Sequence, residues 1–165
     1  MKITKRSNIY LPMVAMILTV ALAVSASAQN QVPFKGAMQG NDTDSNFTAN
    51  TVLVTTSGTG IGTLVGQFSF TQETTVNFAD GTDAGSAHWR AANGDSIDTT
   101  IAGSGEPTDP SGVTIRITEI HTVTGGTGRF ARARGSFIVE RLANAVTFFT
   151  SGSFHGSITS PGAAH

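Results

Sequence analysis

The stretch VTGGTGRFARARGSF, Val123 to Phe137, decides how the second half of this 165-residue sequence is interpreted. It joins two segments with β-strand patterns and combines closely spaced glycines with three arginines. Both common phosphate-binding loops are excluded, because Arg129-Phe130 replaces the Lys-Ser/Thr pair and no helix pattern follows Gly128. Consecutive glycines permit positive φ and close backbone approach, so the stretch is predicted to be a structural crossover between strands, with Phe130 plugging the space beneath it.

Apolar residues elsewhere recur mainly at every second position, which is typical of half-buried strands. The clearest run is LVGQFSFTQETTVNF. One of its faces carries Leu64, Gly66, Phe68, Phe70, Thr74, Val76 and Phe78. The run is longer than an ordinary strand, so we expect either one long barrel strand or two strands separated by a bend. We expect the next segment, DGTDAG (Asp80 to Gly85), to form a turn after this run, because it is rich in Asp and Gly.

The segment SAHWRAANGDSIDTTI predicts a hairpin, and its side chains fix the register. A two-residue loop at Asn93-Gly94 would mix charged and apolar residues on both faces. A three-residue loop, 92–94 with Gly94 left-handed, instead places Trp89 opposite Ile97 and His88 opposite Asp98. Because a slip of one residue moves every side chain to the other face, we predict the three-residue loop.

Further strand patterns lie near residues 32–39 and 51–56 and in VTIRITEIHTV, SFIVERL and VTFFTSGSFHGSI. Seven or eight antiparallel strands with short links favour a sandwich or a barrel. The chain has no cysteine, so no disulfide can support either fold and its stability must come from core packing and backbone hydrogen bonds.

The glycine-rich segment GGTGRFARARG resembles the GGTG-x-F-x-x-ARG segment of plant dirigent proteins and is similar to that of allene oxide cyclases. The matching residues are Gly125, Gly126, Thr127, Gly128, Phe130, Ala133, Arg134 and Gly135. It resembles small exported bacterial proteins of the same superfamily more closely still. Looser patterns extend the likeness to about residues 60–158. The resemblance implies an all-β fold, an eight-stranded antiparallel β-barrel that can hold an apolar small molecule; it carries over no catalytic residue.

The first 28 residues have the layout of a secretory signal peptide. A positively charged start precedes the apolar run Leu11 to Val24, and Ala26-Ser27-Ala28 offers small residues for cleavage near Ala28/Gln29. The apolar run is shorter than the roughly 20 residues of a membrane span, which argues against an N-terminal anchor. We therefore expect residues 29–165 to form a single secreted or periplasmic barrel domain, with a core of about 32–159 and no membrane span.

The composition of the mature chain limits the classes of partner that it is expected to bind. Residues 29–165 contain seven Lys and Arg against eleven Asp and Glu, a net charge of −4. A net acidic chain with no second basic patch is a poor candidate for nucleic-acid binding. The four histidines have no spacing typical of a zinc site, so we expect no metal. No motif indicates a cofactor.

The strand VTIRITEIHTV supplies the candidate site. If it runs straight, Glu119 and His121 point into the barrel, where Arg134 or Arg141 would supply a counter-charge. These four residues would then line a polar floor for a ligand, with Glu119 as a candidate acid or base. The alternative that the sequence favours is a bulge that buries Ile120 and exposes Glu119.

Three functions remain open on the sequence. We expect an exported, non-enzymatic barrel that binds a small apolar ligand. The alternatives are a cofactor-independent enzyme of the cyclase or dirigent type, and a structural or interaction protein with a filled barrel. Small eight-stranded barrels can be filled by side chains or can hold one ligand, so the interior volume separates these functions.

Overall fold

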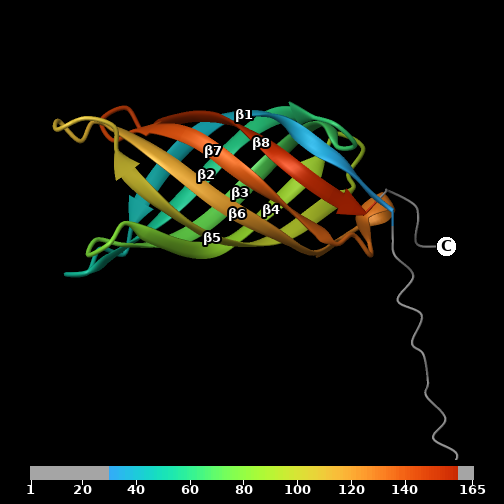
Figure 1. Ribbon diagram of the computed structural model, residues 1–165, viewed down its shortest axis with the longest axis horizontal. Helices are drawn as coiled ribbons and strands as arrows, with labels where there is room; N and C mark the ends of the chain where they lie inside the picture. Colours follow the sequence, from blue (N-terminus) through green and yellow to red (C-terminus); the bar gives the residue numbers. More distant parts are fainter. Residues whose placement is uncertain (1–29, 160–165) are drawn as a thin grey trace, which may run out of the picture.

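The computed structural model describes residues 30–159, which form one closed barrel of eight antiparallel strands in chain order (Figure 1). The strands are β1 (Gln31–Ser45), β2 (Thr51–Gly62), β3 (Gly66–Asn77), β4 (Thr82–Ala91), β5 (Ser96–Pro107), β6 (Thr114–Gly126), β7 (Gly135–Asn144) and β8 (Phe149–Thr159). A short 3-10 turn, η1 (Gly128–Phe130), precedes β7. The predicted eight-stranded antiparallel barrel is confirmed. The predicted signal peptide lies outside the described residues.

Several strands are longer than the sequence indicates. β1 continues past residue 39 to Ser45, and β2 continues past Thr56 to Gly62. β3 is one unbroken strand. A turn follows β3 as predicted, but it occupies residues 78–81 rather than Asp80 to Gly85, because β4 begins at Thr82. In a closed barrel every strand has a partner on both sides, and this pairing holds polar, turn-like segments in the extended conformation.

The predicted β4–β5 hairpin is confirmed. Trp89 pairs with Ile97, His88 pairs with Asp98, and Gly94 has a φ of 93°. On the outer face, His88 Nδ1 lies 2.7 Å from Asp98 Oδ1. The register therefore follows from placing the large apolar side chains of both strands on the same inner face.

The glycine-rich segment forms the crossover between β6 and β7. Positive φ occurs at Gly128 and Gly135, but not at Gly126, where closeness is the constraint: a Cβ there would collide with the carbonyl oxygen of Ser96. Phe130 is fully buried and closes this end of the barrel.

Among residues 30–159, no helix is long and apolar enough to cross a membrane.

Large rings fill the half of the barrel next to this crossover, which we call the aromatic-packed end. Its members are Phe34, Phe68, Phe70, Trp89, Phe130, Phe137 and Phe154, all at most 4% exposed. The Trp89 ring meets Phe137 edge to face at 5.3 Å and Phe68 at 4.9 Å. Such edge and tilted contacts are the favoured aromatic geometries, so this end is a close-packed core.

Candidate functional site

β6 carries Glu119 and His121 into the barrel. Both side chains are fully buried, whereas Ile120 between them is 51% exposed. The bulge favoured from the sequence is therefore wrong at this position. The register shift of β6 against β5 comes later, opposite Asp98 and Thr99, beyond His121. Pairing with β5 and β7 on both sides keeps β6 regular at Glu119.

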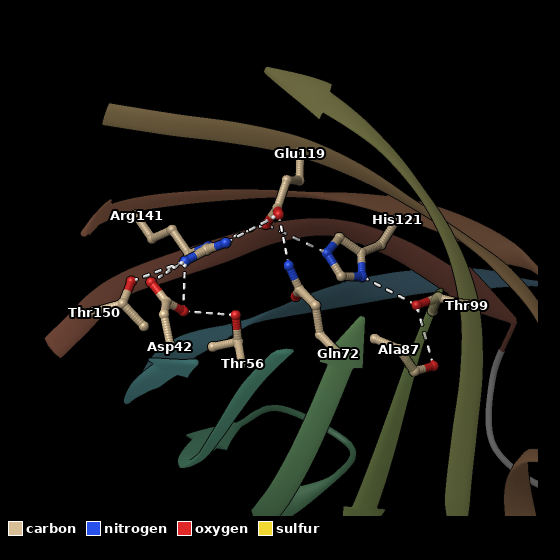
Figure 2. Close-up of polar contacts among 9 residues, drawn as sticks. All are labelled: Asp42, Thr56, Gln72, Ala87, Thr99, Glu119, His121, Arg141 and Thr150. Atoms are coloured by element: carbon tan, nitrogen blue, oxygen red, sulfur yellow. Dashed lines mark hydrogen bonds and ion pairs between the residues drawn. The ribbon is translucent and has the colours of Figure 1, made fainter. Parts of the chain in front are cut away.

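Glu119 is the centre of a buried polar network (Figure 2). Its Oε1 accepts a hydrogen bond from Gln72 Nε2 at 2.6 Å and one from an Arg141 terminal nitrogen at 3.2 Å. Its Oε2 accepts from Arg141 Nε at 3.2 Å. Arg141 on β7 therefore grips the carboxylate with two nitrogens, and Gln72 reaches it from β3 on another side of the barrel. Both oxygens of a buried charge are satisfied.

A second carboxylate lies on the other side of the Arg141 guanidinium. Arg141 Nη1 is 3.4 Å from Asp42 Oδ1 and donates to Thr150 Oγ1 at 3.1 Å. Thr56 Oγ1 in turn donates to Asp42 Oδ1 at 2.7 Å. Arg141 thus lies between Glu119 and Asp42 and is 4% exposed, so its positive charge is already shared by two anions.

The electrostatics fix Glu119 as an anion. Burial alone would raise the pKa of its carboxyl, but His121 and Arg141 outweigh burial and lower the pKa to about 2. Arg141 is the firmer of these two causes, because His121 Nε2 is 3.9 Å from Glu119 Oε2, beyond hydrogen-bond distance. The ion pair is therefore present at neutral pH.

His121 connects the network to the aromatic-packed end. Its Nδ1 lies 3.0 Å from Thr99 Oγ1, and its ring stacks on Phe137 at 5.0 Å and meets Trp89 edge to face. Within the described residues its Nε2 has no hydrogen-bond partner. His121 is therefore packed between the polar network around Glu119 and the aromatic rings.

A cavity of about 330 Å³ lies beyond this network, at the end of the barrel opposite the crossover. We call it the cavity end. Its walls are mainly apolar and include Val52, Val54, Val76, Ile115, Ile117 and Ala143. Asp42, Asp83 and Arg141 form its polar floor. Phe78 and Phe148 line its mouth and are 53% and 43% exposed.

A larger hollow of about 800 Å³ lies on the outside of β1 to β4. Its lining includes outward side chains such as Gln39, Ile61 and Arg90, and it contains no member of the buried network. The cavity end is the better candidate site because it combines enclosure, apolar walls and a few convergent polar groups.

Among the titratable groups of the cavity floor, Asp83 has the fewest hydrogen-bond and ion-pair partners. It is 8% exposed, and its Oδ1 has no hydrogen-bond partner among the described residues. Burial raises the pKa of this carboxyl to about 6; the Glu119 charge adds to the increase and Arg141 opposes it. Asp83 therefore changes its charge near neutral pH, whereas Glu119 does not.

The structure brings together only part of the site expected from the sequence. Glu119, His121 and Arg141 meet inside the barrel, but only Arg141 lines the cavity. Arg134 lies at the opposite end, where it donates to the carbonyl oxygen of Thr124 at 2.8 Å. Glu119 holds Arg141 in place but does not line the cavity, whereas Asp83 is a buried carboxyl group that does line it and has a pKa of about 6.

Sequence reasoning missed three residues of the floor and network. Gln72 occupies an inward position between Phe70 and Thr74, so strict alternation on β3 would have found it. Asp83 shares a face with Trp89 on β4, and Asp42 continues the inner face of β1. Both aspartates stand in turn-like sequence, which hides the strand that carries them.

Among residues 30–159, no three His, Cys, Asp or Glu side chains are grouped so that they would hold a metal ion. Comparisons of the chain with protein-family models, with curated proteins and with solved structures find no match.

Proposed function

We propose that this protein binds a small apolar molecule in the cavity end of its barrel. The observation that carries the proposal is the cavity of about 330 Å³, with apolar walls above a charged floor. This volume is at the lower end of the range of small-molecule sites, and the pattern of apolar lining with few polar groups is typical of them.

The rest of the barrel supports this function. The aromatic-packed end supplies a rigid core, so the cavity end does not need side chains of its own to fill it. The mouth gives the ligand a route of entry past Phe78 and Phe148. The alternative of a structural or interaction protein is tied to a filled barrel, and a filled barrel would leave no cavity of this size.

The likeness of the glycine-rich segment to dirigent and allene oxide cyclase proteins supports a place in that barrel superfamily, and the N-terminal sequence supports export. A second function, a cofactor-independent cyclase or isomerase, is favoured by one observation. Asp83 faces the cavity with a pKa of about 6, which suits a proton donor near neutral pH.

The proposal is tested by filling the cavity. Ile117→Trp places an indole inside the cavity end, and Ile120→Trp places one on the outer face of the same strand. Native mass spectrometry after incubation with decanol is expected to show one bound molecule on the wild-type protein and on Ile120→Trp, and none on Ile117→Trp. Circular dichroism checks that both variants fold. Equal binding by Ile117→Trp would place the ligand elsewhere and overturn the proposal.

A further inference from the structure

The cavity end carries an excess of negative charge. Three carboxyl groups line it, from Asp42, Asp44 and Asp83, while Arg141 is the single cationic side chain in its lining. Arg141 is already paired with Glu119 and Asp42. Within residues 30–159, neither Asp44 nor Asp83 has a cationic partner within 4.0 Å. The site is therefore short of positive charge.

Asp83 is the point at which this shortage is most costly. The residue is 8% exposed, it lines the cavity, and one of its carboxyl oxygens has no hydrogen-bond donor among the described residues. A buried carboxylate without a donor or counter-charge is strongly disfavoured. A cationic donor inside the cavity would supply both at once.

We propose that the ligand is a lipophilic amine, whose apolar body lies against the walls of the cavity and whose protonated amino group pairs with Asp83 at the floor. This inference rests on the proposed function and specifies its ligand class. A carboxylate ligand would instead compete with Glu119 and Asp42 for Arg141 and would meet uncompensated negative charge at Asp83. A neutral alcohol would donate one hydrogen bond and leave the charge in place.

The volume sets the size of such an amine. At roughly 30 Å³ for each water-sized group, a cavity of this volume holds about eleven non-hydrogen atoms. A saturated amine of about ten carbons has this size. Its tail would reach from the floor toward Phe78 and Phe148 at the mouth.

Three unbranched ligands of ten carbons each, which differ in their head group, separate the contribution of the head group from that of the tail. Isothermal titration calorimetry at pH 7.5 is expected to show decylamine binding at least tenfold more tightly than decanol, with decanoate weakest. If decanol binds as tightly as decylamine, the head-group inference is wrong and ligand binding stands. Tightest binding by decanoate would assign the site to Arg141 and also overturn the inference. Absence of binding by all three would remove the proposed function itself.

Asp83→Asn tests the residue while keeping its shape. We expect decylamine affinity to fall about tenfold and decanol affinity to stay within about twofold. Asp98→Asn, on the outer face beside His88, is the matched control and should change neither. Unchanged decylamine affinity in Asp83→Asn would overturn the pairing. Asp44→Asn, nearer the mouth, gives a second measurement should Asp83→Asn fold poorly, with an expected loss of about threefold; no loss would count against the inference.

The pH dependence of decylamine binding provides an independent test of the role of Asp83. Because burial raises the pKa of Asp83 to about 6, decylamine binding should strengthen between pH 5 and pH 7.5 while decanol binding stays level. The charged groups that face this part of the barrel are Glu119 from β6, Arg141 from β7, and Asp42 and Asp44 from β1. The residues that pair with Asp83 on the neighbouring strands, Val76 on β3 and Gly103 on β5, have no titratable side chain. A flat amine profile across this range would contradict the role of Asp83.

Discussion

The two ends of the barrel share the same eight strands and differ in the size of their inward side chains. On β3, Phe68 and Phe70 fill the aromatic-packed end, and Thr74 and Val76 leave space at the cavity end. Buried and exposed residues alternate in the same way from Phe68 to Thr75, through both halves of the strand. Side-chain volume at alternate positions therefore decides where a small barrel is solid and where it can hold a ligand.

The polar network marks the boundary between these ends. Glu119, Gln72 and Arg141 reach across the interior from three strands (Figure 2). His121 lies beside them and stacks on the ring of Phe137. The hydrogen bonds from Gln72 and Arg141 hold the Glu119 carboxylate in one position, and this fixes the depth of the cavity floor.

The largest expected effect comes from the aromatic-packed end. Phe137→Ala removes a ring that contacts Phe34, Trp89 and Phe154, and we expect it to lower the free energy of unfolding by about 3–5 kcal/mol. Ile117→Ala at the cavity end should cost less than about 1.5 kcal/mol, because that side chain already borders empty space. Urea denaturation measures both. Similar costs at the two sites would remove the distinction between the ends.

The boundary itself is tested by Glu119→Gln. The change leaves the buried Arg141 with Asp42 as its remaining anion, and we expect a loss of about 3 kcal/mol at pH 7. The pKa of Glu119 is lowered to about 2 in the folded state, so this stabilisation is present above the ordinary Glu pKa and disappears as the pH falls toward 2. The cost of the variant should shrink in parallel.

Glu140→Gln, on the exposed face of β7, is the control for that variant and should change the unfolding free energy by less than about 0.5 kcal/mol. A Glu119→Gln protein as stable as this control would show that the network is not a fixed boundary.

A smaller effect of opposite sign is expected at the cavity floor. The raised pKa of Asp83 means that the folded protein holds this proton more tightly than the unfolded chain, so stability is lost as the pH rises from about 4 to about 6. Asp83→Asn removes this penalty and should stabilise the protein by about 1–2 kcal/mol at pH 8, after allowance for partial solvent screening. Denaturation at pH 4 and pH 8 measures it. If the variant is less stable than wild type at pH 8, the Asp83 carboxylate must have stabilising partners in the folded protein, and this account of it is wrong.

Much of the fold could be predicted because the two faces of each strand differ. Large apolar residues at every second position set the β4–β5 register, with Trp89 opposite Ile97. The positions of Asp42 and Asp83 could not be predicted, because their local sequence favours turns and only pairing with neighbouring strands makes them extended. Local propensity yields to the closure of the barrel at these points.

The site was harder to predict for a different reason. The pairing of Glu119 with Gln72 joins β6 to β3, and nothing in either segment names the other as a partner. The cavity depends on the combined volumes of side chains from several strands. Alternation reveals which residues point inward, but it does not reveal how much space they leave.

The most direct measurement is an NMR titration of methyl-labelled protein with decanol. Because its head group is neutral, decanol tests binding in the cavity without relying on the proposal of an amine ligand. We predict chemical-shift changes at the methyl groups of Val52, Val54, Ile115 and Ile117, which line the cavity, and none at Ile97 or Ile158, which pack among the aromatic rings. Changes confined to outward residues such as Ile61 and Ile120, or no changes at all, would contradict a ligand-binding cavity at this end of the barrel.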